Sequence, residues 1–211
     1  MYSLPYLIDK TLSVIFPEKC AFCGQGGGII CPSCMAGLMS ERCLGGNSIE
    51  GIDGSYSGFI YHKPMTKKLI HRMKRDRNRA LFYTAAQLLC EELKYNADYV
   101  WADFVTHLPR DPVKKRIMGL DQSQQLAKAI ASITGKPYID AVKRVEKAEE
   151  QKTLNRTERK ENMRGVFTSS PVRGKVILVD DVLTTGSSVC AAAEALKKAG
   201  AERVYVVTFA R

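Results

Sequence analysis

The sequence predicts an α/β fold with a mostly parallel sheet, preceded by a small cysteine-rich unit. Two observations carry this prediction. From about residue 51 onward, strand-like and helix-like segments alternate, which is the pattern of a parallel α/β sheet. Ahead of them, Cys20 and Cys23 form one closely spaced pair and Cys31 and Cys34 form another. We therefore expect two units, at residues 1–50 and 51–211.

The composition is that of a folded, soluble protein. With 211 residues, the chain can form one domain of ordinary size and a small appendage. Hydrophobic residues make up 45% and charged residues 26%, which argues against a disordered or fibrous protein. The net charge of +10 favours anionic partners such as phosphates, nucleic acid or acidic lipid surfaces.

The N-terminal stretch does not resemble a secretory signal. It has no basic start, and Asp9 and Lys10 interrupt its apolar residues. No apolar run approaches the length of a membrane span. The seven cysteines are an odd number and include two CxxC pairs, which indicates a cytosolic metal site rather than a secreted disulfide framework. We expect a cytoplasmic protein without membrane insertion.

The spacing of apolar residues predicts where the elements lie. A short amphipathic helix is expected at residues 3–16, ended by Pro17. The clearest unit is the last, in which a β-branched run precedes a helical pattern and Gly200 ends the helix. Further helices are expected at residues 64–75, 80–94, 122–133 and 187–199, and strands near residues 55–61, 103–108, 175–179 and 203–209.

The stretch VILVDDVLTTGSS, residues 176–188, combines a buried strand, two acids and a loop of hydroxyls and glycine. A parallel strand delivers its loop to the carboxyl edge of the sheet, where ligands bind. A glycine, hydroxyl donors and free N–H groups at a helix start form an anion site. The acids would repel that anion, so they should face sugar hydroxyls or a divalent cation. The sequence thus predicts a ligand with a phosphate at one end and a diol at the other, such as a ribose 5-phosphate.

Two other interpretations of this stretch are weaker. A strand followed by a capped helix would explain a single Asp or Ser, but not the whole block. A Walker B strand also ends in acids, but the chain contains no G-x-x-x-x-G-K-[ST] partner motif.

The four paired cysteines have the spacing of one tetrahedral metal site. A tight turn with two residues between cysteines offers two thiolates to one ion, and four thiolates leave no open position for water. A structural zinc is therefore predicted at Cys20, Cys23, Cys31 and Cys34. An iron–sulfur cluster or a pair of redox dithiols remains the alternative.

Residues 176–188 resemble the phosphoribosyl pyrophosphate (PRPP) signature of type I phosphoribosyltransferases. The resemblance implies a sheet of phosphoribosyltransferase type and a ligand, PRPP, bound together with Mg²⁺. It further implies that Asp180 and Asp181 meet the ribose hydroxyls. The 5-phosphate would be held by Thr184, Thr185, Gly186, Ser187 and Ser188.

The whole chain resembles the ComF family of competence proteins. Besides the cysteines and the PRPP block, the resemblance rests on THLPR at residues 106–110, MGLDQ at 118–122, a closing Ala210-Arg211, and the spaced set Gln151, Leu154, Arg159 and Asn162. Met118 and Asp121 replace an arginine and an asparagine of the family pattern, and Arg116 is close enough to replace the arginine. The implied residues for the pyrophosphate end of PRPP are Lys74, Arg110 and Arg116.

The family resemblance implies a role in natural competence, the uptake of DNA and transformation. Implied partners are single-stranded DNA, a competence helicase and an inner-membrane DNA channel, which would place the protein in the cytoplasm or at the periphery of that membrane. The alternative is an active phosphoribosyltransferase that uses an unidentified base or amine acceptor. No general base is evident, and His107, at a predicted strand end, is the one histidine worth testing.

A basic segment at residues 63–79 carries eight Lys or Arg and one Asp. On the helix expected at 64–75, Met65, Leu69 and Met73 recur four apart and should face the core. The basic face that remains can follow a nucleic-acid backbone or can simply be a solvated surface. The candidate nucleic-acid-binding residues are Lys67, Lys68, Arg72, Lys74 and Arg75.

Overall fold

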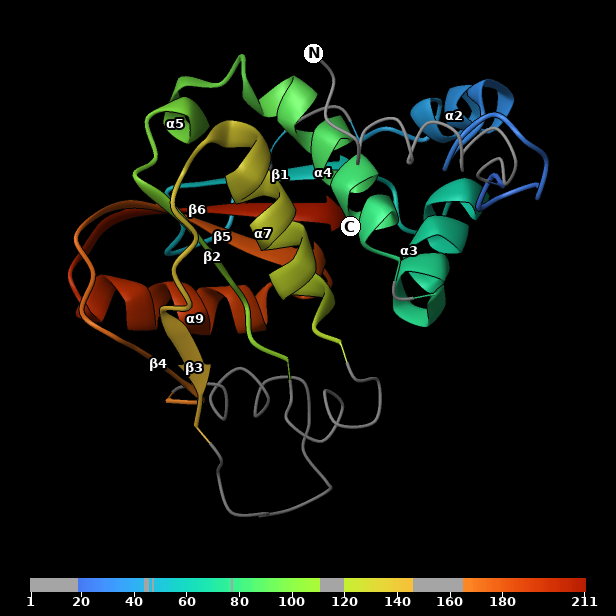
Figure 1. The fold of residues 1–211 in the computed structure, drawn as a ribbon. Coiled ribbons are helices and arrows are strands. Elements are labelled where there is room, and N and C mark those ends of the chain that lie inside the picture. The colour runs from blue at the N-terminus through green and yellow to red at the C-terminus, as the bar shows by residue number, and fades with distance from the viewer. Residues whose placement is uncertain (1–18, 44–45, 47, 77, 111–119, 146–164) are drawn as a thin grey trace, which may run out of the picture.

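The computed structural model describes residues 19–43, 46, 48–76, 78–110, 120–145 and 165–211. Its centre is a four-stranded parallel sheet, which confirms the predicted α/β class (Figure 1). The order across the sheet is β1 (Gly54–Phe59), β6 (Ala201–Ala210), β5 (Gly174–Val182) and β2 (Phe104–His107).

The β5 strand lies inside the sheet and is hydrogen-bonded on both sides. Ile177 stands opposite Tyr205 of β6 and Val105 of β2. The residues from Val176 to Val179 are buried, as expected for a β-branched run covered on both faces. The strand continues beyond the predicted residues 175–179 and ends at Val182, so Asp180 and Asp181 are the two residues before its last one. The acid pair therefore sits on a rigid element.

Helices cover both faces of the sheet. α4 (Arg79–Leu93) and α7 (Gln122–Thr134) pack on one face, and α9 (Ser187–Lys198) packs on the other (Figure 1). A small antiparallel pair, β3 (Val142–Arg144) with β4 (Phe167–Ser169), lies on the α9 side. The four helices predicted from residue 64 onward are confirmed to within about one residue at their ends, but β3 and β4 were not predicted.

Local chemistry explains where these helices begin. The Asn78 side chain accepts a hydrogen bond from the N–H of Ala80 at 2.9 Å and caps α4. Asp121 caps α7 by accepting from the N–H of Gln124 at 3.3 Å. α7 ends at Gly135, whose φ of 69° lies in the left-handed region that glycine adopts readily.

The cysteine-rich unit packs against the sheet domain and shares its core. α2 (Pro32–Met39) follows Cys31 and lies beside α3 (Pro64–Asp76) (Figure 1). Cys20, Phe22 and Leu38 belong to the same buried cluster as Leu69 of α3 and Phe209 of β6. Neither α2 nor the short α5 (Ala97–Val100) was predicted. The helix expected at 3–16 lies outside the described residues.

In the part of the chain that the structure describes, no helix has both the length and the apolar character needed to cross a bilayer.

Candidate functional site

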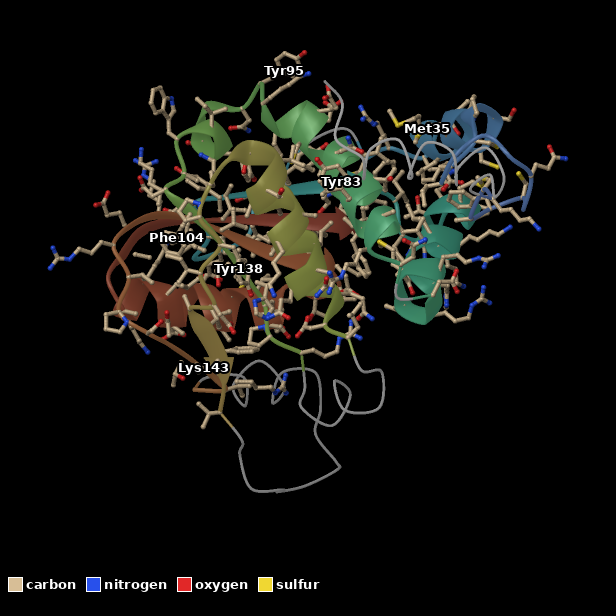
Figure 2. All side chains as sticks on the ribbon, in the orientation of Figure 1. Met35, Tyr83, Tyr95, Phe104, Tyr138 and Lys143 are labelled. Atoms are coloured by element: carbon tan, nitrogen blue, oxygen red, sulfur yellow. The ribbon has the colours of Figure 1, made fainter. Side chains whose placement is uncertain are left out.

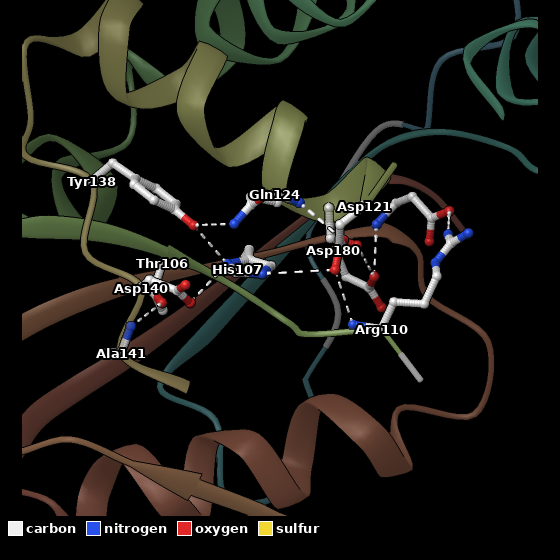
Figure 3. Close-up of polar contacts among 11 residues, drawn as sticks. Thr106, His107, Arg110, Asp121, Gln124, Tyr138, Asp140, Ala141 and Asp180 are labelled. Atoms are coloured by element: carbon white, nitrogen blue, oxygen red, sulfur yellow. Dashed lines mark hydrogen bonds and ion pairs between the residues drawn. The ribbon is translucent and has the colours of Figure 1, made fainter. Parts of the chain in front are cut away.

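Residues of α7, of α3 and of the segment just beyond β2 hold the acid pair at the end of β5; Figure 3 shows Asp180 and Arg110. Asp180 Oδ1 accepts hydrogen bonds from Ser123 Oγ of α7 at 2.7 Å and from the N–H of Asp181 at 2.8 Å. Asp181 Oδ1 accepts from the N–H of Val182 at 2.9 Å. Its other oxygen, Oδ2, lies 3.1 Å from Arg110 Nη2 and 3.6 Å from Lys74 Nζ. Two cations therefore meet at one carboxylate.

The two carboxylates have different electrostatic surroundings. Burial, followed by the neighbouring charge of Asp181, raises the pKa of Asp180 to about 8. The hydrogen bonds from Ser123 and from the Asp181 backbone oppose that rise without cancelling it. Neutral hydroxyl donors, such as those of a sugar, add no further negative charge beside this crowded pair.

The loop after the acids has the features of an anion site. Gly186 is the N-cap of α9 with φ 77°, a left-handed conformation that favours glycine. Thr184 and Thr185 are exposed, and Thr185 Oγ1 lies 3.2 Å from Ser187 Oγ. The first N–H groups of α9 follow directly, at Ser187 and Ser188. The structure thus places all five predicted loop residues together, within a few positions of the acid pair.

A segment that precedes β1 borders this loop. The Ile49 Cγ2 methyl lies 3.7 Å from the point where a Cβ on Gly186 would stand. The Cys190 thiol of α9 donates to the Glu50 carbonyl at 3.6 Å, and Lys197 Nζ donates to the Gly51 carbonyl at 2.9 Å. Residues 49–51 therefore run beside α9 from its N-terminus onward.

Of the three basic residues expected at a pyrophosphate, the structure brings two to the acid pair. Lys74 comes from α3, whose Met73 is buried, and Arg110 lies three residues beyond the end of β2. Arg116 lies outside the described residues, as does Met118. The family-pattern residues Gln151, Leu154, Arg159 and Asn162 are also outside them.

Sequence reasoning missed two groups of contacts around the site, although His107 and Asp121 themselves were named in it. Ser123 contacts Asp180 across 57 positions of sequence, and no local pattern marks it. The second group lies behind Arg110: Asp121 accepts from the Arg110 N–H, and His107 hydrogen-bonds Tyr138 (Figure 3). The strand-end position of His107 and the departure from the family pattern at Asp121 were the available signals.

The four predicted metal ligands lie together. The Sγ atoms of Cys20, Cys23, Cys31 and Cys34 are all within 4.8 Å of one another. Those of Cys23 and Cys31 are 3.7 Å apart, and a tetrahedral zinc with Zn–S bonds of about 2.3 Å needs sulfurs separated by about 3.8 Å. The cluster could therefore hold a metal such as zinc.

Thiolate character within the cluster fits the same interpretation. Burial raises the pKa of Cys20, but backbone N–H donors from Cys31 and neighbouring residues outweigh that effect and lower the pKa to about 6. The N–H groups of Cys31 and Phe22 lie 3.3 and 3.4 Å from its sulfur. By contrast, burial and the other cysteines raise the pKa of Cys34 to about 12. A cation among the four sulfurs would stabilise all four as thiolates.

The five basic residues of α3 differ in what they contact. Lys68 Nζ donates to the Phe22 carbonyl at 2.6 Å, and Lys74 reaches Asp181. Arg72 and Arg75 both bind Asp76, at 3.0 and 2.8 Å. Lys67 is exposed on the same helix. Part of the basic face, at Lys68 and Lys74, therefore contacts other parts of the protein.

Comparisons with known proteins agree with this architecture. Residues 119–211 match the family model described as phosphoribosyl transferase domain. That segment contains the acid pair, the anion loop and α7.

Three relatives match larger or smaller parts of the chain. Competence protein ComFC of Streptococcus pneumoniae (strain ATCC BAA-255 / R6) is 31% identical over 186 residues, which cover 86% of this chain and 80% of that protein. DNA utilization protein YhgH of Salmonella typhi is 28% identical over 151 residues, 69% of this chain and 66% of that protein. Competence protein F of Haemophilus influenzae (strain ATCC 51907 / DSM 11121 / KW20 / Rd) is 32% identical over 100 residues, 44% of this chain and 43% of that protein.

Proposed function

Because this chain belongs to the ComF family of competence proteins, we propose that it is a PRPP-binding, phosphoribosyltransferase-like protein that acts in natural competence. The observation that carries the proposal is the meeting of Lys74 and Arg110 at Asp181, three residues before the hydroxyl loop begins. Carboxylates accept from ribose hydroxyls, and the cations and the loop attract phosphate groups. The acid pair, the two cations and the loop would thus meet the ribose, the pyrophosphate and the 5-phosphate of PRPP.

In the ligand-free protein, the two cations contact Asp181, and PRPP would take the place of this carboxylate when it binds. Arg110 and Lys74 neutralise Asp181 while no ligand is bound. An arriving pyrophosphate group competes for both cations, and the ribose hydroxyls then donate to the carboxylates in their place. The 5-phosphate accepts from the N–H groups and hydroxyls of residues 184–188. Mg²⁺ would enter with the pyrophosphate group and neutralise part of its charge.

Calorimetry with PRPP and Mg²⁺ tests the PRPP site directly. The double variant Asp180→Ala with Asp181→Ala should lose at least tenfold in affinity, because it lacks both hydroxyl acceptors (about 1.4 kcal/mol per factor of ten). A matched control removes two exposed acids far from the loop, Glu91 and Glu202, by substitution with Ala. Equal PRPP binding by the acid-pair variant and the wild type would overturn the assignment.

A transfer reaction is the second candidate function, favoured by the match of residues 119–211 to a phosphoribosyl transferase domain. In such a reaction an acceptor displaces pyrophosphate at C1 of the ribose. Release of pyrophosphate from PRPP that depends on both Mg²⁺ and an acceptor would support it. If PRPP binds but no pyrophosphate is released across a broad panel of bases and amines, the protein is a binding module.

Single-stranded DNA is the proposed macromolecular partner, and the outer face of α3 is the proposed contact. Lys67, Arg72 and Arg75 remain on that face, whereas Lys68 and Lys74 contact the protein. Among nearby aromatic residues, Phe82 is buried but Tyr83 is 44% exposed on α4 and could stack a base (Figure 2).

The DNA proposal is tested by the salt dependence of binding. Replacing Lys67 and Arg75 by Ser should weaken binding of a fluorescent oligonucleotide and reduce the slope of log K against log salt by roughly 1.4 units, about 0.7 for each phosphate contact. The control replaces Lys143 and Arg173, two exposed basic residues outside α3, by Ser. Identical slopes for both double variants would contradict a DNA contact at α3. Co-purification with a competence helicase and a DNA channel would test the remaining proposed partners.

A further inference from the structure

A partly buried ring of polar side chains lies directly behind Arg110 (Figure 3). His107, the last residue of β2, and Asp121, the N-cap of α7, are each only 2% exposed. Tyr138 and Gln124 complete the ring. Buried polar groups cost free energy unless they are well paired, so such a ring is kept in place by its mutual contacts.

Asp121 fixes the backbone from which the Arg110 side chain extends. Its Oδ2 accepts from the Arg110 N–H at 3.2 Å, and its Oδ1 accepts from the Gln124 N–H at 3.3 Å. The guanidinium of the same Arg110 then reaches Asp181, and its Nη2 lies 3.1 Å from Asp181 Oδ2. Asp121 therefore joins the first turn of α7 to the loop that carries one of the two cations on the acid pair.

His107 lies on the other side of Asp121. Its Nε2 is 3.8 Å from Asp121 Oδ2, and its Nδ1 is 2.9 Å from the Tyr138 hydroxyl. The Gln124 side chain donates to that hydroxyl oxygen at 3.2 Å. The hydroxyl can then donate its own hydrogen to Nδ1, which leaves the ring hydrogen of a neutral imidazole on Nε2, facing Asp121. A protonated ring also has an N–H on Nε2, so in both states an N–H faces the carboxylate.

We propose that Asp121 and His107 are positioning residues that hold Arg110 ready for the pyrophosphate end of the ligand. The inference rests on the proposed PRPP site. As the guanidinium passes from Asp181 to the arriving anion, the Arg110 backbone stays fixed on Asp121, and the side chain needs little reordering. His107 keeps the Asp121 carboxylate oriented by an N–H on its far side. Neither residue has to touch the ligand.

The test uses three ligands that carry different parts of PRPP: PRPP itself, inorganic pyrophosphate and ribose 5-phosphate, each with Mg²⁺. In calorimetry, Asp121→Ala should weaken the binding of PRPP and pyrophosphate by about tenfold or more, the usual scale for losing a hydrogen bond to a charged group. His107→Phe removes a longer contact, of 3.8 Å, and should weaken the binding of both ligands to a smaller extent. The affinity for ribose 5-phosphate should change by less than about twofold, because this ligand has no pyrophosphate group to contact Arg110. The distant Glu202→Gln variant is the control and should leave all three unchanged.

Conservative variants separate positioning from a general loss of structure. Asp121→Asn keeps one oxygen, which can accept from the Arg110 N–H, and His107→Gln keeps a donor directed at Asp121. Each should therefore restore part of the affinity that is lost in Asp121→Ala or His107→Phe. If Asp121→Ala or His107→Phe fails to fold, Tyr138→Phe removes only the hydroxyl from the ring and should weaken pyrophosphate selectively. An equal loss for all three ligands, or no loss for any, overturns the inference.

A measurement on the free protein keeps this inference distinct from the PRPP site. Hydrogen exchange of the Arg110 amide should accelerate in Asp121→Ala and in His107→Phe, because the acceptor is removed or loosened. If the wild type binds no PRPP but exchange of the Arg110 amide still accelerates in the variants, the proposed function fails while the positioning contact stands. If wild type binds PRPP and the amide does not respond, the positioning role is wrong.

Discussion

Lys68 of α3 donates a hydrogen bond through Nζ to the carbonyl oxygen of Phe22, at 2.6 Å. Phe22 lies between two of the clustered cysteines, and its own N–H points at the Cys20 sulfur. Six residues further along α3, Lys74 contacts Asp181. One helix thus contacts the cysteine cluster near its start and the acid pair near its end.

The Lys68 contact should contribute to stability. Lys68→Met keeps the apolar stem and removes the donor, so we expect the free energy of unfolding to fall by roughly 1 kcal/mol, the net value of an ordinary hydrogen bond. For a chain of this size that lowers Tm by about 2–4 °C. Lys67→Met, at an exposed position on the same helix, is the control and should leave Tm unchanged. Equal Tm values for the two variants would show that the contact adds nothing.

Glu41 should contribute more, because its buried carboxylate caps α3. Its oxygens accept from the N–H groups of Met65 and Thr66, at 3.1 and 2.7 Å, and from the Thr66 hydroxyl at 2.9 Å. Removing them leaves the first amides of the helix unpaired, so Glu41→Ala should cost about 2 kcal/mol in chemical denaturation. Glu41→Gln keeps an acceptor and should lose less. A cost below that of the exposed Glu202→Ala would contradict the capping role.

Metal removal should destabilise the whole protein, since the cysteine unit and the sheet share one core. Purified protein is expected to contain about one zinc per chain by elemental analysis, and chelation should lower Tm by at least about 5 °C. Cys34→Ser should reduce the zinc content, whereas Cys90→Ser, at a cysteine outside the cluster, should not. Iron in place of zinc, or a Tm insensitive to chelation, would argue for the other interpretations of the cysteines.

The ligand-free protein should lose stability as the pH rises towards about 8. Burial and the charge of Asp181 raise the pKa of Asp180 from 3.8 to about 8 in the folded state. Between these values the folded chain binds more protons than the unfolded chain, so the free energy of unfolding decreases with rising pH. Asp180→Asn removes this dependence. Urea unfolding measures the free energy of unfolding of both proteins from pH 5 to pH 8, and the difference between them should grow in favour of the variant. A difference that stays constant over this range would contradict a raised pKa at Asp180.

The sequence could predict the elements whose pattern is long and regular. β5 and α9 stand out because a β-branched run is followed by helical spacing and a glycine. β3 and β4 contain three residues each, too few for a periodic signal, and they pair across a long separation in sequence. α2 begins at Pro32, directly after Cys31, and its 8 residues make about two turns, too few for a clear periodic signal.

The site was predictable only where its residues are neighbours in sequence. Asp180, Asp181 and the loop after them form one continuous motif. Ser123 approaches Asp180 because α7 packs on the sheet, and Asp121 approaches Arg110 for the same reason. The helical pattern correctly placed Lys68 and Lys74 away from the buried face, but it could not say that the first reaches Phe22 and the second Asp181. Such pairings depend on tertiary packing.

The run of residues 49–51 along α9 constrains how the chain can be divided. A fragment that starts at residue 51 would lack the Ile49 methyl beside Gly186 and the Glu50 carbonyl that accepts from Cys190. It would also lose Cys20 and Phe22 from the buried cluster that they share with residues of α3 and β6. Recombinant fragments intended to isolate the phosphoribosyltransferase-like part should therefore keep the cysteine cluster, and a calorimetric scan of the full chain should show a single cooperative transition.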